Sequence, residues 1–395
     1  MKLKLSVVSV TLIILGLGAP PYHAVARAAD DVIESFTVDV NGGLLIIPVT
    51  INGKEHPFAV DTGSTVAVFD SRLKPVLNAT GDKVPVNGGE MVELYTCPTA
   101  TVGRSKLKAG TWAISTDLAD LRRQTGYNIS GILGIGFLRG KLVQINFDAG
   151  KLTILKRGTH VVGQKIPLRV ADDGLPLVDV DLPIVGTVPF LIDTGCCGFH
   201  NGFLSKPTFA ALCRAKEIES YTGTTPTVSV LDGPVTTQMG LLTWQSVSGL
   251  KHCDQMYTLD NSYKSRNGLG LGYLSRYTMT IDFHNWELIL EKGKWFDRAG
   301  PANQAGIDIV MNGGMPVVAW VDANGPGWMA GVRAGDRIVS IDGTDARDLK
   351  LDQIGDKLYW VRGGFSMTLL HAMEADSHEI RLLQKASARR ATKLQ

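Results

Sequence analysis

Hydrophobic and polar residues alternate with a period of two over several parts of the chain, notably residues 36–40 and 178–182. A strand that buries one face produces this alternation, so both segments are predicted to be β-strands. The pairs Asn52-Gly53 and Asp232-Gly233, and the triplet Asn87-Gly88-Gly89, stand between apolar runs and predict hairpin turns. The pattern therefore favours a mainly β structure.

Two short helices are also expected. Ser115 or Thr116 is in place to cap a helix that runs through Leu121. Ser205 precedes Lys206-Pro207, and proline is favoured in the first turn of a helix.

The order of the apolar segments repeats once. The segment Leu133–Leu138 recurs as Leu269–Leu274, and the strand-like triplet at 145–147 recurs at 281–283. The repeating unit is much longer than a solenoid repeat, which indicates duplication of a domain-sized unit.

An Asp-Thr-Gly triplet stands at the same place in each copy, at residues 61–63 and 193–195, directly after an apolar run. Two like charges a few ångströms apart cannot both ionise easily, so one of two adjacent carboxyl groups retains a proton. A turn aspartate that caps local amides is the alternative for either copy alone. The matched pair favours a catalytic dyad formed by Asp61 and Asp193.

These motifs resemble those of the bilobal pepsin-like and retropepsin-like aspartic peptidases. The first copy reads Asp61-Thr62-Gly63-Ser64, and the apolar-apolar-Gly segment of that family is present as Ile132-Leu133-Gly134 and more loosely as Leu269-Gly270. The resemblance implies two tandem β-barrel lobes of the acid-protease type. It also implies an endopeptidase whose two aspartates activate one water molecule.

The resemblance assigns supporting roles around the dyad. Gly63 and Gly195 allow backbone amides to approach the carboxylates, and the hydroxyls of Thr62 and Thr194 hydrogen-bond across the lobe interface. Ser64 is expected to hydrogen-bond to the outer oxygen of Asp61.

The second copy departs from the family pattern, because Cys196 and Cys197 follow Gly195 where serine or threonine is usual. A thiol is a weaker hydrogen-bond donor than a hydroxyl, so Asp193 has weaker expected support. The alternative function is a weakened or inactive protease-like protein that binds peptides.

The region over the cleft and the cysteines around it permit further interpretations. The hairpin near residues 87–89 is the expected flap over the cleft, and Tyr95 is read as an ordinary strand tyrosine. The set Cys196, Cys197, His200 and Cys213 raises the alternative of a metal site, and Cys197 with His200 raises that of a thiol nucleophile. Their spacing does not match a paired zinc motif, and no third orienting residue is implied, so neither a metal nor a cofactor is expected.

The termini and composition set the context. Residues 1–28 are predicted to be a signal peptide. Lys2 and Lys4 precede an apolar run that is too short to span a membrane as a helix. This predicts a secreted or periplasmic protein with no stable membrane span after cleavage.

A net charge of +2 over 395 residues does not indicate a basic surface that would bind nucleic acid. Cys213 and Cys253 are a plausible disulfide among the five cysteines.

The C-terminal part resembles a PDZ domain of the kind attached to bacterial envelope proteases. The resemblance rests on Gly325-Pro326-Gly327, Ala330-Gly331-Val332, the segment 335–341 and Asp342-Gly343. A PDZ domain adds an extended peptide to a sheet edge and captures its terminal carboxylate on backbone amides. The loop expected to do so consists of Gln304, Ala305, Gly306 and Ile307, beside a helix that includes Leu351, Ile354 and Leu358.

The chain is therefore divided into a signal peptide at 1–28, a first lobe at 31–160, a second lobe at 161–296, a small α+β PDZ domain at 304–384 and a disordered basic tail at 385–395. The expected partners are protein or peptide substrates and peptide C-termini. Because one chain supplies both aspartates, a monomer is expected.

Overall fold

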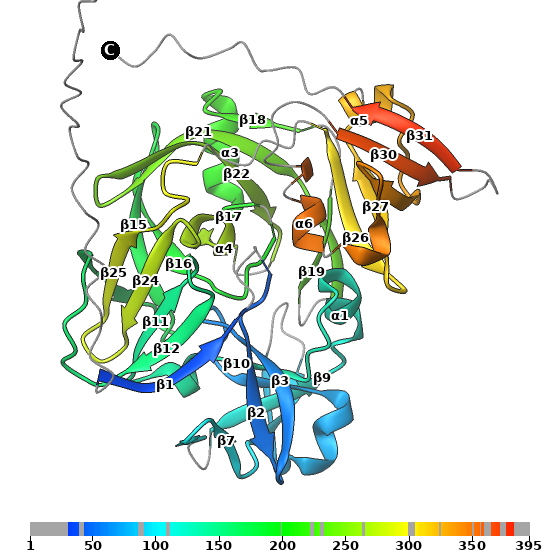
Figure 1. Ribbon diagram of the computed structural model, residues 1–395. Helices are drawn as coiled ribbons and strands as arrows, with labels where there is room; N and C mark the ends of the chain where they lie inside the picture. The colour runs from blue at the N-terminus through cyan, green and yellow to red at the C-terminus, as the bar shows by residue number, and fades with distance from the viewer. Residues whose placement is uncertain are drawn as a thin grey trace, which may run out of the picture.

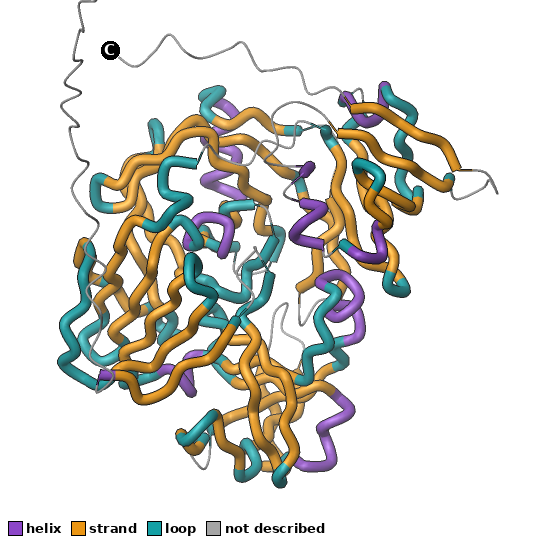
Figure 2. Tube along the Cα trace, in the orientation of Figure 1, coloured by secondary structure: helices purple, strands orange, loops and turns teal. Residues whose placement is uncertain are grey.

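The computed structural model describes residues 31–38, 43–85, 91–107, 111–198, 200–221, 225–229, 233–262, 265–298, 305–323, 325–349, 351–355, 357–358, 365–371 and 377–382. The predicted signal peptide, the turn at residues 87–89, Gln304 and the predicted basic tail lie outside these residues. Strands dominate the part that is described, as expected for a mainly β protein (Figure 2). None of its helices is long and apolar enough to cross a bilayer.

The first lobe is built on a nine-stranded sheet in the order β5-β6-β9-β4-β10-β3-β2-β7-β8. The predicted turn at Asn52-Gly53 joins the antiparallel strands β2 and β3, and both turn residues have positive φ, as this type of hairpin requires. The elements of this lobe are β2 (Ile46–Ile51), β3 (Lys54–Val60), β4 (Ala67–Asp70), η2 (Ser71–Val76), β5 (Asn78–Pro85), β6 (Met91–Thr96), β7 (Ala100–Val102), β8 (Ser105–Lys106), β9 (Trp112–Thr116), α1 (Ala119–Thr125), β10 (Gly131–Leu133) and α2 (Ile135–Leu138).

The helix expected to be capped by Ser115 or Thr116 is misplaced. Both residues belong to β9, which pairs in parallel with β4 up to Asp70 and Thr116. Sheet pairing therefore overrides the capping preference, and α1 begins only at Ala119.

The second lobe is built on an eight-stranded sheet in the order β14-β15-β16-β23-β17-β22-β21-β18. The predicted helix start is confirmed, because Ser205 caps α3 through a hydrogen bond from the amide of Thr208. The elements of this lobe are β14 (Arg169–Val170), β15 (Pro176–Leu182), β16 (Gly186–Ile192), β17 (Gly202–Ser205), α3 (Lys206–Arg214), β18 (Ile218–Ser220), β19 (Thr225–Ser229), β20 (Gly233–Thr237), β21 (Met239–Val247), β22 (Leu250–Asp260), β23 (Gly268–Leu269) and α4 (Leu271–Leu274). The strands β19 and β20 pair as a separate antiparallel hairpin.

A six-stranded sheet joins the two lobes, in the order β1-β12-β11-β24-β25-β13. Its elements are β1 (Val32–Thr37), β11 (Leu142–Asn146), β12 (Lys151–Leu155), β13 (Gln164–Pro167), β24 (Tyr277–Asp282) and β25 (Glu287–Lys292). The central pair, β11 and β24, is antiparallel and comes from the two repeated segments of the sequence. The order on each side of that pair is the same, so the sheet is pseudo-symmetric about it (Figure 1).

The C-terminal module forms its own sheet in the order β26-β27-β28-β30-β31, so β26 ends the sheet on one side. Its elements are β26 (Ile307–Asn312), β27 (Met315–Val321), α5 (Pro326–Met329), β28 (Arg337–Ile341), β29 (Thr344–Asp345), η4 (Ala346–Asp348), α6 (Leu351–Gly355), β30 (Phe365–Leu370) and β31 (Ser377–Leu382). Helix α6 packs against β26, beside the second lobe (Figure 1).

Candidate active site

The two aspartates occupy equivalent positions in the two lobes. Asp61 follows β3, and Asp193 follows β16. In the first lobe β10 lies between β3 and β4, parallel to one and antiparallel to the other. In the second lobe β23 lies in the same way between β16 and β17. The amide of Asp61 donates to Leu133 O at 3.0 Å, and the amide of Asp193 donates to Leu269 O at 3.0 Å, so the same backbone contact fixes both turns.

The structure brings the two carboxyl groups together, and they hydrogen-bond to each other. Asp61 Oδ1 accepts from the amide of Gly63 at 2.7 Å, and Asp193 Oδ1 accepts from the amide of Gly195 at 2.9 Å. Both aspartates are half-buried, so solvent still reaches them. Each carboxyl group is therefore held by its own turn while it faces its counterpart from the other lobe.

Each glycine makes room for the carboxyl group of the opposite lobe. A Cβ atom on Gly63 would lie 2.7 Å from Asp193 Cγ, and one on Gly195 would lie 2.4 Å from Asp61 Cγ. Neither distance is tolerated by real side chains, so any other residue would push the carboxyl groups apart. The amide of Gly195, which donates to Asp193 Oδ1, also acts to lower the pKa of Asp61, in line with the expected close approach of backbone amides.

The two threonines, each next in sequence to an aspartate of the dyad, link the lobes directly. Thr62 Oγ1 donates to Ile192 O at 2.5 Å and accepts from the amide of Thr194 at 3.0 Å. Thr194 Oγ1 donates to Val60 O at 2.8 Å and accepts from the amide of Thr62 at 3.0 Å. Both threonines are buried, so these four reciprocal hydrogen bonds are shielded from water.

The surroundings favour one shared proton on the dyad. Burial raises the pKa of Asp61, although amide hydrogen bonds offset part of this effect. Burial and the negative charge of Asp61 together raise the pKa of Asp193 well above its ordinary value. A dyad that holds one proton into a higher pH range can present an acid and a base at the same time.

The residues after the two glycines differ from each other. The sequence predicted that the hydroxyl of Ser64 would hydrogen-bond to the outer oxygen of Asp61, and this prediction is wrong. The hydroxyl donates instead to Val66 O at 2.9 Å, because the turn brings that carbonyl within reach. On the other side, the amide of Cys196 donates to Asp193 Oδ1 at 3.0 Å, so backbone contact supports the carboxylate whatever the side chain.

The cysteines near the dyad are neutral thiols. Cys196 Sγ lies 3.9 Å from His200 Nδ1, so Cys196 rather than Cys197 is the neighbour of the histidine. Burial raises the pKa of Cys196 well above its usual range and that of Cys197 to about 12, and burial lowers the pKa of His200 to about 4. A reactive thiolate–imidazolium pair is therefore disfavoured.

The predicted disulfide between Cys213 and Cys253 is wrong, and all five cysteines are free. Cys213 is half-buried against the apolar core from α3, whereas Cys253 is exposed on β22. Within the described residues, no three His, Cys, Asp or Glu side chains are grouped as metal ligands.

The expected flap hairpin is present up to its last paired residues, Pro85 and Met91 of β5 and β6. Its turn at 87–89 lies outside the described residues. Tyr95 is buried in the core of the first lobe, and its hydroxyl donates to Glu93, so it is a strand tyrosine as expected.

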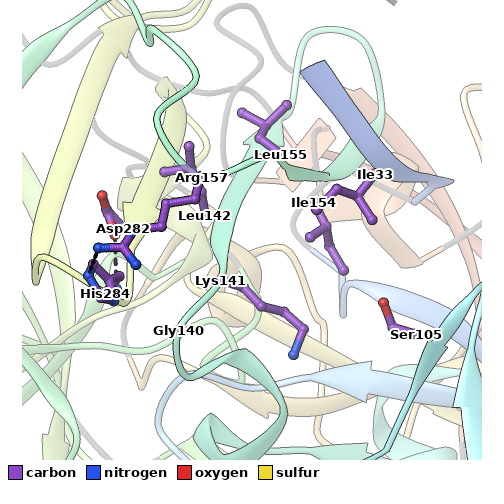
Figure 3. Close-up of a pocket in the computed structure, with 10 residues that line it drawn as sticks. All are labelled: Ile33, Ser105, Gly140, Lys141, Leu142, Ile154, Leu155, Arg157, Asp282 and His284. Carbon is purple, nitrogen blue, oxygen red and sulfur yellow. Dashed lines mark hydrogen bonds between the residues drawn. The ribbon is translucent and has the colours of Figure 1, made fainter. Parts of the chain in front are cut away.

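One surface hollow lies on the sheet that joins the lobes. The residues that line it include Lys141, Arg157, Asp282 and His284 (Figure 3). Neither aspartate of the dyad lines this hollow. Arg157 and His284 contact each other in this hollow (Figure 3). It is a feature of the shared sheet and is separate from the paired aspartates.

The loop expected to capture a carboxylate precedes β26. Ala305 is buried, and Gly306 has a φ of 65°, a left-handed conformation that favours glycine. Ile307 begins β26, so the loop leads directly into the edge strand. Ile354 and Leu358, expected beside the groove, are fully buried in the core of the module.

Comparison with known proteins gives one family match. A PDZ-domain family matches residues 317–370, in agreement with the C-terminal sheet, so the chain carries a C-terminal PDZ domain. No curated protein matches the chain significantly.

Two solved structures of proteases are similar to parts of the chain. The photosystem II D1 C-terminal processing protease matches at 28% identity over 21% of this chain and 22% of its own, with a TM-score of 0.20, so the chain spans about a fifth of that protein. An aspartic proteinase from Irpex lacteus matches at 14% identity over 68% of this chain and 99% of its own, with a TM-score of 0.43.

Proposed function

We propose that the protein is an aspartic-type endopeptidase with a C-terminal PDZ domain that recognises peptides. The observation that carries the proposal is the facing pair of half-buried carboxyl groups, Asp61 and Asp193, presented by equivalent turns of the two lobes.

In the proposed mechanism, the ionised member of the dyad takes a proton from a water molecule, and that water attacks the carbonyl carbon of the peptide bond. The protonated member donates its proton to the carbonyl oxygen. The tetrahedral intermediate then collapses, the C–N bond breaks, and a proton passes to the leaving amine. The dyad titrates as a unit, so the roles are assigned to the pair.

The pH profile follows from the raised pKa values. Below the lower pKa of the pair both aspartates are protonated and no base is present, whereas above the upper pKa both are ionised and no acid is present. Because the pKa of Asp193 is raised well above its usual range, the alkaline limb of the profile should lie above the ordinary titration range of carboxyl groups.

The proposed domain boundaries and the proposed localisation rest on the sequence. We propose the division at 31–160, 161–296 and 304–384, with residues 1–28 as a cleaved signal peptide that directs the protein to the periplasm or outside the cell. Because both carboxyl groups belong to one chain, a monomer is sufficient for the reaction.

The test compares the wild type with Asp61→Asn and Asp193→Asn on an unfolded protein substrate from acidic to neutral pH. Asparagine preserves the side-chain shape but cannot cycle a proton, so each variant should lose activity by a factor of at least about 100. Circular dichroism checks that the variants are folded. Equal activity of all three proteins would refute the assignment.

The second candidate is a peptide-binding protein with a weakened dyad, and the thiol of Cys196 is the observation that favours it. The Cys196→Ser variant distinguishes the two functions. A large gain in hydrolysis over a nearly inactive wild type would favour the weakened dyad, whereas good turnover by the wild type would exclude a binding-only protein.

A further inference from the structure

The PDZ domain shares its apolar core with the second lobe. Met239 of β21 and Met256 of β22 are buried in the same cluster as Ile307 and Val318 of the PDZ sheet. Tyr221, next to β18, packs against that cluster as well. Because a continuous apolar core resists sliding, the PDZ domain and the second lobe should move as one body.

Helix α1 of the first lobe also touches the PDZ domain, and it packs against the edge strand β26. Just after this helix, Gly126 takes a left-handed conformation with a φ of 76°, and a Cβ atom on it would lie 3.4 Å from Met311 Cγ. The helix is firmly part of the first lobe, because Leu121 is buried in that lobe's core and Arg122 forms an ion pair with the buried Asp70.

The contact lies on the strand that a peptide would use. A PDZ ligand holds its terminal carboxylate at the loop before β26 and extends along that strand. Met311 is four residues beyond Ile307, or about 13 Å along the strand at roughly 3.3 Å per residue. A bound peptide of five or more residues therefore reaches the place where α1 meets β26.

We propose that α1 and a peptide of five or more residues with a free C-terminal carboxylate compete for the end of β26. Since α1 moves with the first lobe and β26 moves with the second, binding of such a peptide shifts the first lobe relative to the second. The hairpin β19–β20 packs on α1, and β19 packs on β27, so the same displacement disturbs an element of the second lobe. If the proposed peptidase activity holds, ligands of the PDZ domain regulate the opening of the cleft.

A crosslink tests the competition without any need for catalysis. In the double variant Gly126→Cys with Met311→Cys, oxidation should join α1 to β26, and reduction should release it. The probes are two fluorescein-labelled peptide pools, four and ten residues long, with random internal positions and a C-terminal Ala, Val, Leu or Phe. Fluorescence anisotropy measures binding to the full chain, and the two single-cysteine variants control for oxidation of native thiols.

We expect oxidation of the double variant to weaken binding of the ten-residue pool by at least about tenfold, within the usual range of coupling between sites. Binding of the four-residue pool should change by less than about twofold, because four residues stop short of Met311. Equal binding of the ten-residue pool by oxidised and reduced protein would overturn the proposal, and so would the absence of binding by every form.

A second measurement uses the unmodified protein, in case the cysteine variants do not fold. Addition of the ten-residue pool should speed amide hydrogen exchange in α1, and the four-residue pool should not. Unchanged exchange in α1 at saturating ten-residue peptide would contradict the competition. The Asp61→Asn variant should behave as the wild type in both measurements, so a failure of the proposed peptidase activity would remain distinguishable.

Discussion

Replacing Thr194 by valine should destabilise the protein substantially, although the two side chains have nearly the same shape. The hydroxyl of Thr194 donates to Val60 O at 2.8 Å and accepts from the amide of Thr62 at 3.0 Å. Thr194 is fully buried, so water cannot replace either partner. An unsatisfied buried donor or acceptor costs about 1–3 kcal/mol, and the variant leaves one of each, which predicts a loss of about 2–6 kcal/mol.

The matched control is Thr194→Ser, which retains the hydroxyl and loses one methyl group. It should lose only about 1 kcal/mol of unfolding free energy from reduced apolar burial. Urea denaturation, followed by tryptophan fluorescence, measures the unfolding free energy of both variants. The slope of free energy against urea concentration should stay unchanged, which shows that both variants unfold in the same way as the wild type. If the valine variant proves as stable as the serine variant, the reciprocal threonine bonds do not stabilise the lobe interface.

Three further predictions concern the residues around the dyad and the ion pair of Asp70 in the first lobe. Gly195→Ala should fold but lose at least about 100-fold in hydrolysis, since its Cβ overlaps the Asp61 carboxyl group; activity near that of the wild type would contradict the geometry. Asp70→Asn should lower stability by about 2 kcal/mol at pH 7, measured by urea denaturation. Burial opposes ionisation of Asp70, but hydrogen bonds from Arg122 and Arg72 lower its pKa to about 2. The difference in unfolding free energy between wild type and variant should therefore persist above pH 4 and shrink as the pH falls from 4 towards 2. Cys196→Ser should change hydrolysis by less than about tenfold, because the amide of residue 196 already supports Asp193; a larger change would show that the side chain controls the dyad.

Local chemistry was the part of the fold that could be predicted from the sequence. The Asn52-Gly53 turn and the Ser205 cap depend on neighbouring residues alone, and both are confirmed. The displaced start of α1 and the unpaired Cys213 and Cys253 depend on distant partners, which no local pattern reveals. Sheet pairing with β4 decided the first, and the second depends on where the fold places the two cysteines, Cys213 on α3 and Cys253 on β22.

At the candidate site, the sequence predicted the paired aspartates, glycines and threonines because the duplication repeats them. It assigned the Ser64 hydroxyl to Asp61, whereas a carbonyl two residues further along takes that hydrogen bond. The backbone acceptors of the threonine bonds, Val60 and Ile192, carry no side-chain signal. The ion pairs of Asp70 were also missed, because Arg122 lies far along the chain and reaches Asp70 only through the fold.

The antiparallel contact of β11 with β24 joins the two copies of the duplicated unit in one sheet, and both copies belong to one polypeptide. In a symmetric homodimer, every substitution beside the dyad would occur twice and alter both carboxyl groups together. A fused chain is free of that constraint, so a change after one glycine can be tolerated while the other half remains as it was. The difference between Ser64 and Cys196 is a divergence that a symmetric homodimer could not accumulate, and it allows the two halves to specialise separately during evolution.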